Sequence, residues 1–195
     1  MVFSRPWRRS SDARPVSPKA RRRSIIEWTA FAVVAVVASL LIRTFVFQTF
    51  FIPSASMEPT LMKGDRIIVD KLSVDFGTIN RGDVVVFKAP PGVRQDCGDP
   101  VVDLVKRVIG LPGDHLNSKG NTIYVNGQPL IENWPHYEPL GSAIDHVTVL
   151  AGQYFMVGDD HFNSCDSRTW GTVPRSDIIG KVFVRVWPLS RFGFL

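Results

Sequence analysis

Three segments of the chain contain polar side chains that can do chemistry. The first is Phe51–Leu61, which reads FIPSASMEPTL. Pro53 and Pro59 restrict the backbone around them and predict an extended, stiff segment. Ser54 and Ser56 then share a face, because alternate residues of an extended chain point the same way. A serine hydroxyl becomes a strong nucleophile when a base removes its proton. The alternative interpretation is a linker rich in Ser and Pro.

The second segment, Asp103–Asp114, supplies a candidate base. As a strand it places Leu104, Lys106 and Val108 on one face. We expect an amine between two aliphatic side chains to lose water, which lowers the pKa of a lysine. A general base needs that neutral amine. The alternative is a lysine at a strand edge whose amine reaches solvent.

The third segment, Gly158–Gly171, reads GDDHFNSCDSRTWG and is dense in polar side chains. Asp166 and Arg168 are two residues apart and can pair with each other. Ser164 provides a hydroxyl that can orient another group. The alternative is a loop whose Asp, Ser and Asn side chains only make its own turns.

Neither a metal site, nor a cofactor, nor a thiol nucleophile is predicted. No Cys/His spacing is of the zinc type, and the histidines at 115, 136, 146 and 161 are not expected to cluster. His161 and Cys165 lie in one turn-rich loop, whereas the partners of a thiol protease are normally distant in sequence. Cys97 and Cys165 form either one disulfide or two separate thiols.

The elements that must position these segments begin with a basic tail. Residues 1–24 contain eight Lys or Arg residues and one Asp, a net charge of +7. The whole chain carries +5, so the remainder carries −2. A nucleic-acid partner is therefore not expected, because its groove needs basic residues spread over a folded face. The tail lacks apolar periodicity and is predicted to be disordered.

Residues 25–50 are apolar around every side of a helix. Such a helix reaches about 39 Å, enough for a bilayer core of about 30 Å, and we predict a transmembrane helix over residues 25–48. A buried core helix and a cleavable signal peptide are the alternatives, and Ser54-Ala55-Ser56 has the small-x-small pattern of a cleavage site. The basic tail stays in the cytoplasm, which places residues 51–195 outside.

Short β-type runs separated by Gly, Pro and Asn turns follow from residue 49 onward. They predict a mainly β fold, in which the transmembrane helix precedes an all-β catalytic domain over residues 49–195. Residues 115–145 are the most irregular stretch and are expected to form a small insert. Asn126-Gly127 is a hairpin signal. The expected strands are Arg66–Lys71, Asp83–Phe87, Val101–Ile109, Thr122–Val125, His146–Leu150, Tyr154–Val157 and Ile178–Trp187.

Together and in this order, the three segments resemble the motifs of the type I signal peptidase (leader peptidase) family of Ser/Lys-dyad serine proteases. The resemblance covers essentially the whole chain. The family's Ser-Gly-Ser-Met-x-Pro-Thr-Leu corresponds to Ser54–Leu61. Its Lys-Arg-x-x-Gly-Leu-Pro-Gly-Asp corresponds to Lys106–Asp114, and its Gly-Asp-Asn-x-x-Asn-Ser-x-Asp-Ser-Arg-x-Trp-Gly to Gly158–Gly171.

The chain departs from these motifs at a few positions. Ala55 replaces the usual Gly, a mild change unless the backbone needs a positive φ there. Asp160 replaces the usual Asn, and His161-Phe162 replaces the usual Arg-Asp pair. These changes alter the charges of the third segment but leave its Ser, Asp and Arg in place.

The resemblance implies a serine endopeptidase that removes N-terminal signal peptides through an acyl-enzyme, cutting after small residues in an Ala-x-Ala-like pattern. Ser56 aligns with the nucleophile and Lys106 with the general base. The Ser54 hydroxyl aligns with the group that joins the Ser56 amide in the oxyanion hole. The other implied roles are dyad support by Ser164, Asp166 and Arg168, and substrate-pocket walls formed by Phe50, Ile52, Met57 and Leu104.

The resemblance also implies a location and partners. We expect a single-pass plasma-membrane protein with a cytoplasmic N-terminus and an extracytoplasmic catalytic domain. Its partners would be secretory precursors and the lipid bilayer, close to the secretion translocon. Two alternatives are a Ser/Lys protease dedicated to one cargo protein and a non-catalytic membrane-anchored β-domain receptor. Apolar residues near the C-terminus either touch lipid or pack in the core; they are Trp187, Phe192, Phe194 and Leu195.

Overall fold

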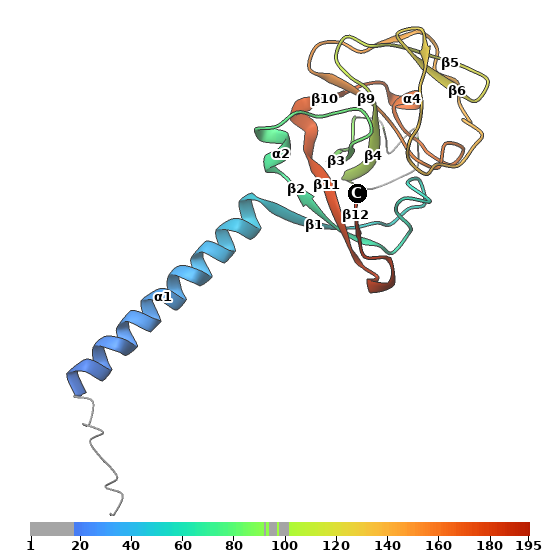
Figure 1. Ribbon diagram of the computed structural model, residues 1–195. Coiled ribbons are helices and arrows are strands. Elements are labelled where there is room, and N and C mark those ends of the chain that lie inside the picture. The colour runs from blue at the N-terminus through green and yellow to red at the C-terminus, as the bar shows by residue number, and fades with distance from the viewer. Residues whose placement is uncertain (1–17, 92, 94–96, 98–101) are drawn as a thin grey trace, which may run out of the picture. The chain divides into compact units, whose positions relative to one another are not determined.

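The computed structural model in Figure 1 describes residues 18–91, 93, 97 and 102–195. The chain divides between Leu41 and Ile42 into two compact units. We describe each unit by itself.

A long helix, α1, begins in the first unit and runs over Pro18–Phe45. The predicted disorder of residues 1–24 is therefore wrong for residues 18–24, and residues 1–17 lie outside the described residues. All side chains from Glu27 to Leu40 are exposed. Of the helices described, none is both long enough and apolar enough for a membrane span.

The second unit consists mainly of antiparallel strands, which confirms the predicted mainly β fold. Its larger sheet has the order β1-β2-β11-β3-β4-β9-β10, and β12 pairs with β11. The end of the predicted transmembrane helix is wrong, because the chain is already a strand from Phe47. The strands are β1 Phe47–Phe51, β2 Arg66–Asp70, β3 Val84–Lys88, β4 Asp103–Gly110, β9 Gln153–Val157, β10 Val173–Pro174, β11 Ile178–Trp187 and β12 Gly193–Phe194.

A smaller sheet of order β7-β6-β5-β8 lies at the end of this unit away from β1 and β2 (Figure 1). The insert over residues 115–145 is thus more regular than expected, because it contains three of these strands. Asn126 and Gly127 have φ values of 53° and 79° and make the predicted hairpin turn between β6 and β7. The strands are β5 His115–Lys119, β6 Thr122–Val125, β7 Gln128–Pro129 and β8 Val147–Thr148.

Both faces of the larger sheet are covered by apolar side chains. On β3, Val85 and Phe87 join one buried cluster, whereas the alternate residues Val84 and Val86 join another. The loop after β1 covers the second cluster with Ile52, Met57 and Leu61. The short helices of this unit are α2 Leu72–Asp75, α4 Ser167–Trp170, η1 Arg175–Asp177 and η2 Leu189–Arg191.

Candidate active site

Ser56 lies in a series of turns between β1 and β2 rather than in the extended segment that the prolines predict. The amide of Leu61 donates to the carbonyl oxygen of Met57 at 2.8 Å, and both side chains are almost fully buried. Burial of these two side chains anchors the turns to the sheet. Ser54 and Ser56 nevertheless lie together, with their Oγ atoms 3.4 Å apart.

The amine of Lys106 reaches Ser56 from β4. Its Nζ lies 2.5 Å from Ser56 Oγ, and the Lys106 residue is 3% exposed. Leu104 and Val108, two residues before and after it on the strand, are buried in the core, as the alternation predicts. A solvent-reaching lysine at a strand edge is therefore the wrong interpretation, because β4 lies between β3 and β9.

A buried ion pair holds β4 against the third polar segment. Arg107 donates from Nε to Asp159 Oδ1 at 2.7 Å and from a terminal nitrogen to Oδ2 at 2.6 Å. This guanidinium stacks on the Trp134 ring, with Arg107 Cζ 4.9 Å from the centroid of the ring. Charge-assisted bidentate bonds of this kind are strong and fix orientation. The residue next to Lys106 on β4 is thus fixed to the loop that follows β9.

Within that loop, Asp166 and Arg168 form the pair that the sequence predicts. Two nitrogens of the guanidinium donate to the carboxylate at 2.8 and 2.6 Å, and both side chains are buried. Asp166 also accepts the backbone amide of Gly158 at 3.0 Å, and Arg168 donates to the carbonyl oxygen of His161 at 2.9 Å. The pair therefore ties both ends of the loop together.

The predicted role of Ser164 is to hold the Lys106 amine. Its Oγ is buried and has no hydrogen-bond partner among the described residues. The same loop does contact the Ser56 segment, because the amide of Asp160 donates to the carbonyl oxygen of Ser56 at 3.2 Å. The support role of Ser164 stays a prediction.

Gly158 occupies a position where no larger side chain fits. A Cβ atom there would collide with the carbonyl oxygen of Ser56 and with the hydroxyl of Ser164. We expect Gly158→Ala to displace Ser56 and to lower kcat/KM by about 100-fold, because small misplacements of reacting groups cost about that much. Cleavage kinetics with a purified precursor measure the effect.

Gly193→Ala is the matched control, because a Cβ at Gly193 meets no atom within 4 Å and the backbone there has no positive φ. It should retain the activity of the unmodified protein. Full activity of the Gly158→Ala protein would mean that the backbone around Ser56 tolerates displacement.

A cavity of about 210 Å³ opens beside Ser56 and Lys106. All four side chains predicted as pocket walls line it, namely Phe50, Ile52, Met57 and Leu104. Sequence reasoning missed several other lining residues, because they come from β3, from the segment before β4 and from the third polar segment. These are Val86, Val93, Cys97, Asn163, Cys165 and Trp170.

The two cysteines form a disulfide, one of the two alternatives that the sequence left open. Cys97 and Cys165 are 68 residues apart in the chain, with Cα atoms 5.9 Å apart. Both line the cavity. The bond therefore connects one wall of the cavity to the loop that carries Ser164.

Removing this disulfide should destabilise the fold. A cross-link closing a loop of this length restricts the unfolded chain and typically contributes about 2–4 kcal/mol. We expect the Cys97→Ser/Cys165→Ser protein to lose about that much free energy of unfolding in urea titrations. The unmodified protein with reductant should behave like the variant. An unchanged urea midpoint in both would show that the bond contributes nothing to stability.

The expectation that the histidines do not cluster is wrong for two of them. The rings of His136 and His161 stack with centroids 4.9 Å apart. They are 25 positions apart in the sequence, so no local spacing reveals the contact. Only the docking of the insert on the third polar segment brings them together.

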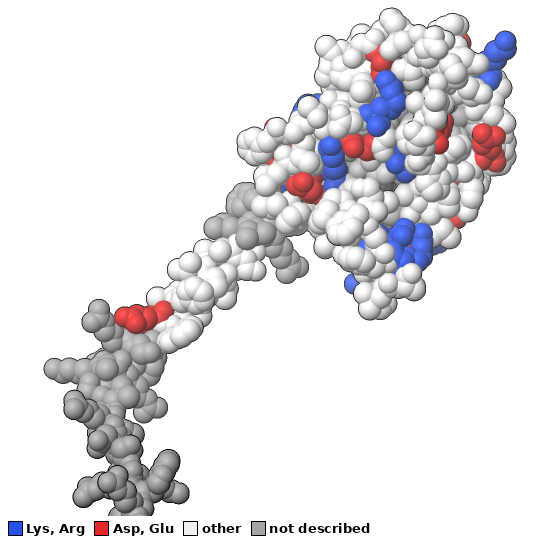
Figure 2. Space-filling model, in the orientation of Figure 1, with Lys and Arg blue, Asp and Glu red and all other residues white. Residues whose placement is uncertain are grey.

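Charges of both signs are interspersed on the face of the molecule in Figure 2. Patches of Lys and Arg on this face lie close to patches of Asp and Glu. This distribution agrees with the small net charge calculated for residues 25–195.

Comparisons of the sequence with a family model and with known relatives agree on one family. A family model described as signal peptidase, peptidase S26, matches residues 25–187. A signal peptidase I of Leptolyngbya laminosa is 39% identical over 97% of this chain and 94% of its own length. A signal peptidase I of Bacillus caldolyticus is 39% identical over 86% of this chain and 93% of its own length. A crystal structure of a signal peptidase I from Enterococcus faecalis matches 53% of this chain and 96% of that chain at 28% identity, with a TM-score of 0.42.

Proposed function

Because the chain belongs to the signal peptidase family, peptidase S26, we propose that it is a serine endopeptidase that removes N-terminal signal peptides from secretory precursors, with Ser56 and Lys106 as its catalytic dyad. The observation that carries this proposal is the 2.5 Å separation of Lys106 Nζ and Ser56 Oγ at the wall of a cavity. A base must lie within hydrogen-bond reach of the proton that it removes.

Burial suits Lys106 to this role. Lys106 is only 3% exposed, so water has little access to its side chain. Desolvation favours the neutral form of an amine. Leu104 and Val108, which share its face of β4, are buried in the apolar core. A neutral amine accepts the proton of the hydroxyl, which activates the serine in the Ser-Lys variant of serine-protease chemistry.

The reaction then follows from these two groups. Ser56 Oγ attacks the scissile carbonyl carbon while Lys106 Nζ takes the hydroxyl proton. Lys106 returns this proton to the leaving amine as the C–N bond breaks, which leaves an ester between the signal peptide and Ser56. Lys106 then takes a proton from a water molecule, which attacks the ester carbonyl carbon. Lys106 returns this proton to Ser56 Oγ as the ester C–O bond breaks, which releases the signal peptide and restores the serine.

Ser54 is the proposed side-chain donor to the oxyanion. Its Oγ lies 3.4 Å from Ser56 Oγ, close to where the oxyanion would form on the carbonyl that Ser56 attacks. The backbone amide of Ser56 would supply the second donor. One donor of this kind typically lowers the barrier by about 2.7–4 kcal/mol. Asp166 and Arg168 would keep the facing loop in place through their buried pair.

The cavity supports a preference for small side chains before the cut. Its volume of about 210 Å³ is modest, and Phe50, Ile52, Met57 and Leu104 give it apolar walls. An extended substrate presents alternate side chains to such a surface. Two small residues separated by one other would therefore enter the cavity together, which is the Ala-x-Ala-like pattern.

We further propose that the N-terminal segment anchors the enzyme in the plasma membrane, with residues 1–24 in the cytoplasm and the peptidase domain, residues 49–195, outside. The basic tail supports this orientation. The disulfide supports an oxidising compartment for the domain. Exposed apolar side chains on α1 support contact with lipid; they are Trp28, Phe31, Val33, Val34, Val36, Val37 and Leu40.

Four apolar side chains near the C-terminus are exposed and do not pack in the core. They support a contact of the peptidase domain with lipid, in addition to that of α1. Ser56 follows the proposed anchor closely in sequence, and an active site near the bilayer would meet signal peptides that are held in it. These side chains are Trp187, Phe192, Phe194 and Leu195.

A precursor-cleavage assay tests the proposed function. The full-length protein in lipid vesicles is mixed with several unrelated secretory precursors, and the N-termini of the products are sequenced. We expect cuts after small-x-small sites in all of them. Cleavage of a single precursor would instead indicate a protease dedicated to one cargo, and no cleavage of any would indicate a non-catalytic receptor.

A further inference from the structure

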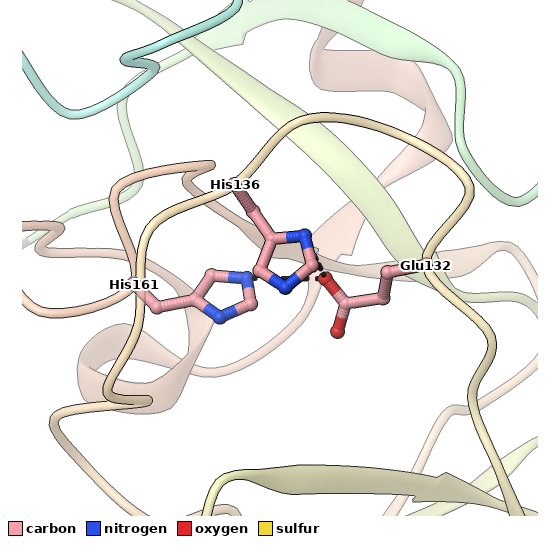
Figure 3. Close-up of side chains that lie close together, drawn as sticks. All are labelled: Glu132, His136 and His161. Carbon is pink, nitrogen blue, oxygen red and sulfur yellow. Dashed lines mark ion pairs between the residues drawn. The ribbon is translucent and has the colours of Figure 1, made fainter.

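Three side chains that can bind a metal ion meet where the insert docks on the loop after β9. Glu132 and His136 come from the insert, and His161 comes from the loop (Figure 3). One ligand atom from each lies within 4.8 Å of the others. None of the three has a part in the proposed dyad chemistry.

Two buried polar atoms in this cluster lack hydrogen-bond partners. His161 is 2% exposed, and its Nδ1 has no partner among the described residues. Glu132 Oε2 is buried as well and accepts no hydrogen bond from them. Buried polar atoms are nearly always satisfied, so the unpartnered carboxylate oxygen of Glu132 calls for a missing partner.

The distances suit coordination better than hydrogen bonding. Glu132 Oε2 lies 3.4 Å from His161 Nε2 and 3.5 Å from His136 Nδ1. A hydrogen bond between such atoms would be about 2.7–3.2 Å long. Two ligands of a tetrahedral Zn²⁺, each bound at about 2.0–2.1 Å, are separated by about 3.3–3.4 Å.

Burial also favours the ligating form of one imidazole. It lowers the pKa of His161 to about 4, so this ring is neutral at neutral pH. The same desolvation is the main cause that raises the pKa of Glu132, and the carboxylates of Asp159 and Glu138 raise it further. A divalent cation between them would supply the missing positive charge.

We propose that Glu132, His136 and His161 bind one divalent transition-metal ion of the Zn²⁺ class. Glu132 binds through Oε2 and His161 through Nε2. His136 Nδ1 also lies 3.0 Å from the carbonyl oxygen of Trp134, so ligation through this atom replaces that hydrogen bond. The rings are stacked, and the His136 ring, whose side chain is 23% exposed, turns to direct a lone pair at the metal. Two imidazoles and a carboxylate leave one position for water.

A metal ion here would clamp the insert to the loop that carries Ser164. Backbone bonds already join these segments, from Tyr137 N to Asp159 O at 2.8 Å and from His161 N to Tyr137 O at 3.1 Å. The clamp does not depend on the proposed peptidase activity, because none of its three ligands belongs to the proposed dyad.

Calorimetric titration with ZnCl₂ tests the site. The full-length protein, without a histidine tag and stripped of metal with a chelator, should bind one Zn²⁺. A saturating excess of about 100 times Kd should raise Tm by about 5–10 °C. Glu132→Gln and His161→Gln should each weaken Zn²⁺ binding at least tenfold, because even the loss of a residue that only supports a metal ligand typically lowers affinity by about 10–100-fold.

His115→Gln is the matched control, because this exposed histidine of β5 lies outside the cluster. It should bind Zn²⁺ as tightly as the unmodified protein. If His161→Gln fails to fold, the smaller change Glu132→Gln decides. Absence of binding, or equal binding by the Glu132→Gln and unmodified proteins, would overturn the proposal.

Discussion

Ser56→Ala should abolish precursor cleavage and leave the fold intact. Removing a serine nucleophile lowers kcat on the order of 10⁶-fold when the other catalytic groups remain. Ser56 is only partly buried, and its loss removes one hydroxyl from the cavity wall without touching the core. The Tm of the variant should therefore stay within about 2 °C of the unmodified value, since surface-type changes cost little stability.

Initial rates of precursor cleavage, measured at saturating substrate, give the size of this loss. Ser142→Ala is the matched control, because Ser142 is an exposed serine of the insert, away from the cavity lining. It should cleave at the normal rate. Retained cleavage by the Ser56→Ala protein would exclude Ser56 as the nucleophile.

Lys106→Met should lower kcat by several orders of magnitude as well, because methionine fills similar space but cannot accept a proton. The buried surroundings of Lys106 tolerate an apolar side chain, so the variant should fold. In the unmodified protein, activity should fall as pH is lowered, because a protonated amine is no base. The variant should lack this pH dependence.

The pH profile of kcat/KM separates a chemical role of Lys106 from a structural one. Lys119→Met, at an exposed position of β5, should leave the profile unchanged. The double variant Ser56→Ala/Lys106→Met should be no slower than either single variant, since groups that act as one unit are not additive. Independent losses that multiply would contradict a dyad.

Much of the β fold could be predicted because its strands alternate or are strongly β-branched. The strands at Thr122–Val125 and Ile178–Trp187 have the predicted bounds. The run around Lys106 was also predicted as a strand, with its two aliphatic neighbours buried beside it. Here the periodicity itself encodes the burial, and the structure only adds which strands are neighbours.

The change from helix to strand at Phe47 could not be predicted, because the apolar run continues through both elements without a break. The strand His115–Lys119 could not be predicted either, because Leu116 is its one buried residue and the others are polar. The predicted extension around Ser56 failed for a different reason. Burial of Met57 and Leu61 favours compact turns there, and local proline rules do not include such tertiary contacts.

Contacts between distant segments account for the rest of what the sequence left open. The pairing of Cys97 with Cys165 and the stacking of His136 on His161 both depend on how loops dock, not on local spacing. The same holds for Lys106 and Ser56, which are 50 positions apart. Only the resemblance to a family brought those two residues together before the structure did.

Mass spectrometry of the enzyme quenched with acid during turnover tests the dyad most directly. We expect an adduct on the peptide that contains Ser56, with an added mass equal to that of the signal peptide minus one water. This adduct should be absent from the Lys106→Met protein at the same time point. An adduct on any other residue of an active enzyme, or equal acylation without Lys106, would exclude the Ser56/Lys106 dyad.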